Sequence, residues 1–144
     1  MLLVDTNVLV YAADADCEEH RKCRALLDSH RRSAMPCYVT WGIVYEFLRV
    51  VTHPKVFRSP WRVADAWGFV EALLGSDGVS VLSHTSRHSA VAAATLAELP
   101  ALRGNLVHDA HTAIVMREHG IRRICTRDTD FHRFPFLEVI DPLA

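Results

Sequence analysis

The stretch MLLVDTNVLVYAA, residues 1–13, places the polar tripeptide Asp5-Thr6-Asn7 between two apolar runs. The residues before Asp5 have the composition of a short buried strand, and the apolar residues after it are also expected to be buried in the core. An ionised carboxylate among apolar side chains costs several kcal/mol unless a partner compensates its charge. Asp5 is therefore expected either at an exposed strand end or beside a bound cation.

The length and composition of the chain favour one domain over residues 1–144. Half of the 144 residues are hydrophobic, which is enough for one substantial core. No apolar run is long enough to span a membrane, and the N-terminus lacks the pattern of a signal peptide, so a cytoplasmic protein is expected. The formal net charge of -1 argues against a surface that binds polyanions over its whole extent. A nucleic acid would have to be bound locally.

The four cysteines show no CxxC spacing, so reduced thiols are expected. Cys17, His20 and Cys23 offer a weak zinc alternative, because they fall within one expected helix and have no second half to complete a tetrahedral site.

Apolar periodicity, caps and breakers predict strands that alternate with helices. Strands are expected near residues 2–4, 37–39, 79–82, 121–126 and 137–140, and helices near 16–30, 41–52, 60–74, 86–99 and 106–119. Thr40, Ser59 followed by Pro60, Thr85 or Ser86, and Asn105 are the expected helix starts. This alternation predicts an α/β fold with a central, mostly parallel sheet flanked by helices.

Four acidic positions are unusual for such a fold. Asp5 and the segment Asp128-Thr129-Asp130 directly follow strands, where the carboxyl ends of a parallel sheet bind ligands. Glu46 and Asp109 each share the spacing of an apolar helix stripe, which predicts that their carboxylates point inward.

Each acid also has an ordinary structural explanation. Asp5 and Asp128 can cap turns or helices, Glu46 can pair with Arg49, and Asp109 can lie at a helix N-terminus. The four together are harder to explain in this way, since a close carboxylate pair costs about 4 kcal/mol of repulsion at an effective dielectric constant near 20. Oxygen ligands without clustered cysteine or histidine suit a hard divalent ion, Mg2+ or Mn2+. Asp5 is therefore expected to hold metal.

The motifs VDTNVLVYA, WGIVYEFLRV, LVHDAHTAIVMREHG and TRDTDF, taken as a set, resemble the PIN-domain ribonucleases, in particular the VapC-type toxins of bacterial toxin-antitoxin pairs. The resemblance covers nearly the whole chain and implies a three-layer PIN-like fold. It implies catalytic acids at Asp5, Glu46, Asp109 and Asp128, metal ligands at Asp5, Asp109, Asp128 and Asp130, and supporting groups at Thr6, Asn7 and Thr126. It also implies Mg2+- or Mn2+-dependent RNA cleavage, a homodimer and a cognate antitoxin protein.

Arginines near the acids are the candidate RNA contacts. Arg49, Arg127 and Arg133 are close to the acids in sequence, although solvated surface charge is the favoured explanation for any single arginine. Tyr11, Trp41 and Trp61 have the chemistry to stack on unpaired bases, but core packing is the expected role of Trp41.

Three rival functions follow from parts of the same pattern. The pair His108-Asp109 matches the metal dipeptide of an all-α phosphohydrolase class, but the alternating fold conflicts with that class. A receiver-like Mg2+-binding module needs a lysine after a late strand, and the segment ICTRD has none. A nuclease of the same fold that trims ribosomal RNA precursors is the third alternative, which the short length disfavours.

Overall fold

The computed structural model describes all of residues 1–144 and contains one five-stranded sheet. The strands are β1 (Leu2–Val4), β2 (Cys37–Thr40), β3 (Val79–Leu82), β4 (Arg123–Cys125) and β5 (Glu138–Ile140). Their order is β3-β2-β1-β4-β5, and every neighbouring pair is parallel. The predicted α/β class is confirmed, and the sheet is parallel throughout rather than mostly parallel.

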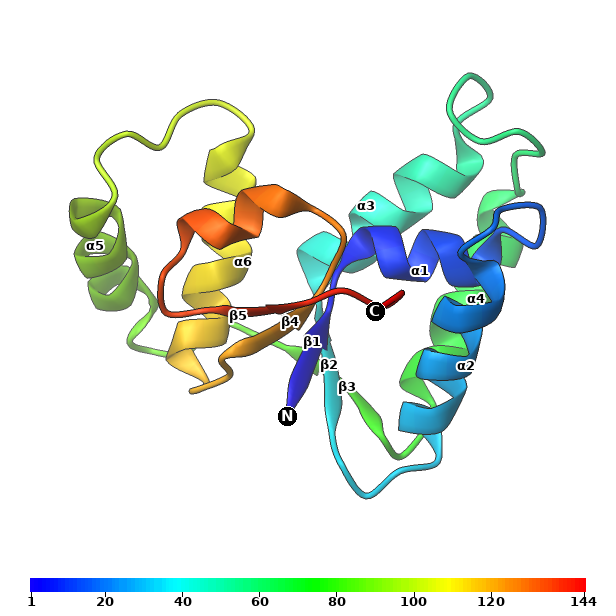
Figure 1. The fold of residues 1–144 in the computed structure, drawn as a ribbon, viewed down its shortest axis with the longest axis horizontal. Helices are drawn as coiled ribbons and strands as arrows, with labels where there is room; N and C mark the ends of the chain where they lie inside the picture. The colour runs from blue at the N-terminus through cyan, green and yellow to red at the C-terminus, as the bar shows by residue number, and fades with distance from the viewer.

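Six α-helices and one 3-10 helix connect the strands. They are α1 (Thr6–Ala13), α2 (His20–Arg31), α3 (Trp41–Thr52), α4 (Val63–Leu74), α5 (His88–Glu98), α6 (Leu106–Glu118) and the 3-10 helix η1 (Thr129–Arg133). Figure 1 shows α5 and α6 on one side of the sheet and α2 and α4 on the other. This arrangement confirms the three-layer prediction.

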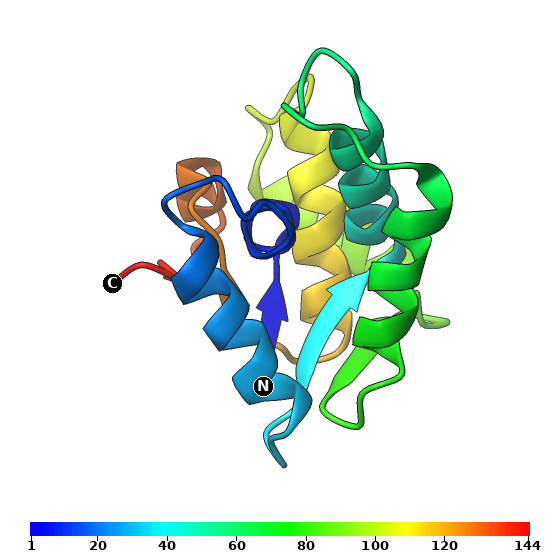
Figure 2. The same cartoon turned by 90° about the vertical axis from the view of Figure 1, so that its right-hand side faces the viewer.

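Helix α1 is the element that the sequence pattern did not predict. Strand β1 ends at Val4, and the Asp5 carboxylate then accepts a hydrogen bond from the Thr6 backbone N–H, as an N-cap residue does. Figure 2 looks down α1, which starts where the arrow of β1 ends. The apolar run after Asp5 is short and has no clear period, so the sequence pattern does not distinguish a helix from a strand there.

Three predicted helix starts were wrong by a few residues. Helix α2 begins at His20 rather than near Asp16, because the Asp14 carboxylate accepts a hydrogen bond from the Asp16 N–H and holds the chain in a turn. Helix α4 begins at Val63, since the Trp61 N–H donates to the Val51 carbonyl and holds the Ser59-Pro60 region outside the helix.

Helix α5 begins at His88, two to three residues after the predicted cap, because the Thr85 hydroxyl accepts a hydrogen bond from the Arg87 N–H in the preceding turn. Asn105 occupies the N-cap position of α6 without a side-chain cap bond. Thr40 caps α3 as predicted, through a 3.1 Å hydrogen bond from the Ile43 N–H to its hydroxyl.

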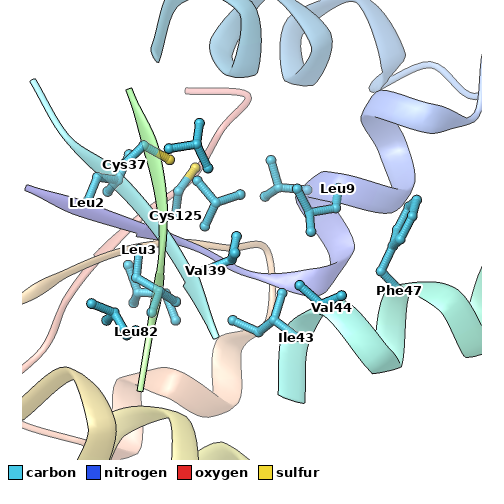
Figure 3. Packing of buried hydrophobic residues seen from close by; sticks show 14 of the residues in the cluster. Leu2, Leu3, Leu9, Cys37, Val39, Ile43, Val44, Phe47, Leu82 and Cys125 are labelled. Carbon is cyan, nitrogen blue, oxygen red and sulfur yellow. The ribbon is translucent and has the colours of Figure 1, made fainter. Parts of the chain in front are cut away.

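The core lies between the sheet and its helices. Figure 3 shows Val39 of β2 on the side of the sheet that faces Leu9 of α1 and Val44 of α3, whereas Leu3 of β1 lies beside Leu82 on the other side. Trp61 joins an aromatic cluster, with its ring centroid 6.4 Å from that of Phe47. The expectation that Trp41 packs in the core was wrong, because 43% of this residue is exposed.

The strand order creates a switch point between β1 and β4. From β1 the chain proceeds to β2 and β3 in one direction, and it returns through α5 and α6 to pair β4 with the other edge of β1. Ligands of open parallel sheets bind at such a point, beyond the carboxyl ends of the strands. Asp5 and Thr126 are the first residues after β1 and β4. None of the helices has both the length and the apolar composition needed to cross a membrane.

Candidate metal centre

Asp5 is a buried carboxylate with a full set of donors. One of its oxygens accepts from the Thr6 N–H at 2.8 Å, and the other accepts from the Thr126 hydroxyl at 2.7 Å and the Asn7 amide at 3.1 Å. Burial raises the pKa of Asp5, and the hydrogen bond from Thr126 opposes that effect. The carboxylate is thus held in one orientation at the end of β1.

Thr126 links the two strand ends. Its hydroxyl donates to Asp5 and accepts from the Asn7 amide at 2.8 Å and from the Asp128 N–H at 3.0 Å. The Asn7 amide oxygen accepts in turn from the Arg127 N–H at 3.1 Å. Asn7 and Thr126 thus support the acids through their side chains, whereas Thr6 contributes its backbone N–H.

Asp109 on α6 and the two acids after β4 converge on the same point. Asp109, Asp128 and Asp130 each offer a carboxylate oxygen, and these oxygens lie within 4.8 Å of one another. Burial, followed by the charges of Asp128 and Asp5, raises the pKa of Asp109 to about 6. No protein donor hydrogen-bonds to the Asp109 carboxylate, and the one cationic side chain paired with the cluster is Arg133, whose Nε lies 3.5 Å from Asp130.

Glu46 lies differently from its prediction. Its carboxylate does not point from an apolar face, because 47% of the side chain is exposed and both oxygens pair with Arg49, at 2.6 and 3.0 Å. The hydrogen bond from Arg49 holds the pKa of Glu46 below its usual range. The pairing with Arg49 that the sequence offered as an ordinary explanation is therefore present. Glu46 nevertheless lines the same groove as the aspartates.

The acids line a groove of about 620 Å3. Its wall contains five carboxylates and a single arginine, and its lining residues are Asp5, Thr6, Gly42, Ile43, Glu46, Arg49, Asn105, His108, Asp109, His111, Thr112, Asp128 and Asp130. The sequence analysis did not identify Asn105 and Thr112 as groove residues. Their spacing from Asp109, four residues before and three after on a helix, is the signal that indicates a shared face.

The three candidate RNA-binding arginines are engaged with acids. Arg49 lines the groove and pairs with Glu46. Arg127 lies outside the groove lining and pairs with Glu19 at 3.1 Å and, more distantly, with an aspartate near the C-terminus. Arg133 also lies outside it and has a long contact of 3.5 Å to Asp130. The structure therefore brings only Arg49 to the acids' groove.

The donor set fits a hard divalent ion. The converging atoms are carboxylate oxygens, and burial raises the pKa of both Asp5 and Asp109, as expected where negative charge is incompletely compensated. The Cys17, His20 and Cys23 alternative has no converging ligand atoms. The Cys17 thiol and the His20 ring both contact the Tyr11 carbonyl oxygen, and all four cysteines are free.

Comparison with known sequences identifies the family. The PIN domain family matches residues 2–137. Ribonuclease VapC43 of Mycobacterium tuberculosis is 37% identical over 143 residues, covering 99% of this chain and 96% of that protein. Ribonuclease VapC48 of the same species is 31% identical and covers 97% of this chain and 96% of that protein.

Solved structures share the fold. Mycobacterium tuberculosis VapC20, described as a Sarcin-Ricin loop cleaving toxin, superposes with a TM-score of 0.68 at 22% identity, covering 98% of this chain and 100% of that chain. VapBC-1 from nontypeable Haemophilus influenzae superposes with a TM-score of 0.67 at 15% identity, covering 99% and 98% of the two chains. The fold and the sequence identity agree that this chain belongs to the PIN-domain family and, within it, to the VapC ribonucleases.

Proposed function

We propose that this chain is a Mg2+- or Mn2+-dependent endoribonuclease that acts as the toxin of a toxin-antitoxin pair. The observation that carries the proposal is the convergence of the carboxylates of Asp109, Asp128 and Asp130 at the switch point of the sheet, next to the buried Asp5. Membership in the VapC ribonucleases supports RNA as the substrate.

Asp5, Asp109, Asp128 and Asp130 are the proposed metal ligands. A bound Mg2+ or Mn2+ polarises a water molecule and neutralises negative charge on the phosphodiester. The hydrogen bonds from Thr126, Asn7 and the Thr6 N–H hold the Asp5 carboxylate in place. The groove has five carboxylates and one arginine, so an RNA backbone is repelled from it until cations are bound.

Asp109 is the proposed acceptor of the proton from the attacking water. Its carboxylate has no hydrogen-bond donor in the protein, in contrast to Asp5, which has three. The pKa of Asp109 is raised to about 6 in the metal-free protein, and the charge of a bound cation would lower it, so that the carboxylate is ionised and able to accept a proton. Glu46 lines the groove with Arg49, and we assign it the role of positioning the substrate phosphate or a second ion.

Two protein partners belong to the proposal. The VapBC-1 structure, which shares this fold, supports a cognate antitoxin as the inhibitor of the groove. Exposed Trp41 and Tyr45 on α3, with Val63 and Trp67 on α4, support a homodimer. The proposed location is the cytoplasm, where RNA and a newly made antitoxin meet.

The test of activity uses purified protein with a structured RNA. Cleavage is expected with Mg2+ or Mn2+ and is expected to stop in excess chelator. Asp128→Asn should lower the cleavage rate by at least about 100-fold, the size of effect seen when a preorganised electrostatic contact is removed. Asp77→Asn is the matched control, since Asp77 is exposed and lies outside the groove. Undiminished cleavage in chelator contradicts the metal-dependent mechanism.

The test of toxicity is expression in a bacterium that lacks the antitoxin. The wild-type chain is expected to arrest growth, and the Asp5→Ala chain, at equal abundance on an immunoblot, is expected to permit it. Equal arrest by both chains separates toxicity from the acidic centre and refutes this part of the proposal.

A further inference from the structure

A second cluster of ligand-type side chains lies beside the acidic centre and is built from different chemistry. His84, in the segment between β3 and α5, His88, the first residue of α5, and His111 of α6 each offer a ring nitrogen, and these nitrogens lie within 4.8 Å of one another. The proposed RNA cleavage by the acids assigns no role to these three histidines, although His111 also lines the groove.

The rings are packed closely enough to share one ion. The His84 and His88 rings stack with centroids 4.1 Å apart, and the His84 and His111 rings meet edge to face at 5.0 Å. The Nε2 atoms of His84 and His111 face each other at 2.7 Å, so one of them carries the shared proton. Two imidazoles on a tetrahedral zinc ion have nitrogens about 3.3 Å apart, given Zn–N bonds of about 2.0–2.1 Å. The two Nε2 atoms therefore need to move only about half an ångström further apart to bind one zinc ion together.

Glu118 fixes the orientation of the third ring. The Glu118 side chain is fully buried, and its carboxylate accepts from the His88 Nδ1 at 2.6 Å and from both the N–H and the hydroxyl of Thr85. A proton on Nδ1 leaves the lone pair of His88 on Nε2, free for a metal. Metal-binding histidines commonly have such a carboxylate on their other nitrogen.

We propose that His84, His88 and His111 form a binding site for one zinc-class divalent cation, with Glu118 as the positioning residue for His88. Three neutral imidazoles favour Zn2+, Ni2+ or Cu2+ over Mg2+. Three protein ligands leave the fourth position of a tetrahedral ion to water.

An ion at this position would help to hold α5 against α6. Thr95 is the only fully buried residue of α5, and polar contacts join this helix to α6 near both of its ends. At the C-terminal end of α5, Glu98 pairs with Arg117 of α6 at 2.9 Å. The proposed ion joins the N-terminal end of α5 to α6, two residues beyond Asp109 on the same helix.

The experiment uses untagged, metal-free protein titrated with Co2+ in the presence of excess Mg2+. Four-coordinate Co2+ with nitrogen ligands absorbs strongly in the visible range, whereas six-coordinate Co2+ with oxygen ligands absorbs weakly. One equivalent of Co2+ is expected to produce the strong band, and one equivalent of Zn2+ is expected to remove it. A weak band alone, or a near-ultraviolet thiolate band from the cysteines, overturns the proposal.

Variants identify the ligands. His84 is exposed, so His84→Ala should fold, lose the strong band and bind Zn2+ at least about 100-fold more weakly in competition with a chromophoric chelator. His53→Ala, on the loop after α3, is the matched control and should keep both. A strong band in His84→Ala overturns the assignment.

Glu118→Gln separates positioning from folding. If Glu118 orients His88, the variant should bind Zn2+ about 10- to 100-fold more weakly even where circular dichroism shows a native fold. Unchanged Zn2+ affinity in a folded variant overturns its assigned role. The proposal is independent of the nuclease assignment, because Asp128→Asn should lose RNA cleavage and keep the strong Co2+ band.

Discussion

At the scale of single residues, Asp109 distinguishes a metal centre from a group of structural acids. Burial and the charges of Asp128 and Asp5 raise its pKa from 3.8 to about 6, so the folded protein binds this proton more tightly than the unfolded chain does. The stability of the metal-free protein is therefore expected to fall as the pH rises from about 4 to about 6. Asp109→Asn removes this dependence.

In chelator at pH 7, Asp109→Asn is expected to be more stable than the wild type. The gain should be about 1 kcal/mol, after allowance for solvent screening of a half-buried group. In Mg2+ the wild type should be stabilised by ion binding, and the variant much less. Melting curves in both conditions and across this pH range provide the measurement. Equal destabilisation of the variant in both conditions indicates a structural acid.

Glu46 is expected to separate activity from stability. Its pair with Arg49 is about half exposed, and such pairs contribute about 0–1 kcal/mol. Glu46→Gln should therefore change the melting temperature little while lowering RNA cleavage clearly. Denaturation curves and cleavage rates on the same preparation test this. Full activity of Glu46→Gln would show that Glu46 has no role in cleavage and serves only to pair with Arg49.

Thr126 is expected to matter for stability, unlike Glu46. It is buried and forms three hydrogen bonds through one hydroxyl. Thr126→Val removes the donor to Asp5 and the acceptor for Asn7, which should lower the free energy of unfolding by about 1–3 kcal/mol. Thr52→Val is the control, since the Thr52 hydroxyl only returns a hydrogen bond to the Leu48 carbonyl. Equal urea midpoints for the two variants contradict a structural network around Asp5.

At the scale of the elements, two glycines should respond to alanine with opposite signs. Gly120 ends α6 with φ of +68°, a conformation that alanine adopts at a cost of about 1–2 kcal/mol. Gly68 lies inside α4, with open space around its missing side chain, so Gly68→Ala should stabilise the protein by about 0.5–1 kcal/mol. Thermal unfolding of both variants tests the helix assignments, and the same sign for both refutes one of them.

The elements also show which sequence signals were reliable. The cap at Thr40 and the long periodic segment of α3 were predicted correctly. Helix α1 was missed because its apolar residues have no polar face to reveal a helical period. The start of α4 was misplaced because Trp61 makes a long-range backbone bond to Val51, which overrides the local signal of Ser59 and Pro60.

At the scale of the whole molecule, a homodimer remains a prediction. Trp41 is 43% exposed and Tyr45 64% exposed on α3, which packs against α4 with its exposed Val63 and Trp67. Exposed apolar groups of this size favour a protein interface. Sedimentation velocity at micromolar concentration should show a dimer, and Tyr45→Arg should shift it to monomer. Met35→Glu, at an exposed position before β2, is the control; a monomeric wild type contradicts the prediction.

The sequence by itself determined the class of the fold, the alternation of its strands with helices and the identity of the acids that deserved attention. These properties depend on local periodicity and on the cost of isolated carboxylates, and both are readable from neighbouring residues. Asp5 and Asp128 could be placed together because residues that directly follow parallel strands meet at one sheet edge.

Only the tertiary structure decided which side chains actually meet. It turned the Glu46 carboxylate toward Arg49 and solvent, paired Arg127 with Glu19 outside the groove, and exposed Trp41. It also brought His84 and His88 to His111. The physical reason is that side-chain orientation and long-range pairing depend on how helices pack across the sheet, and a periodic pattern specifies the face of a helix but not the partner that the face meets.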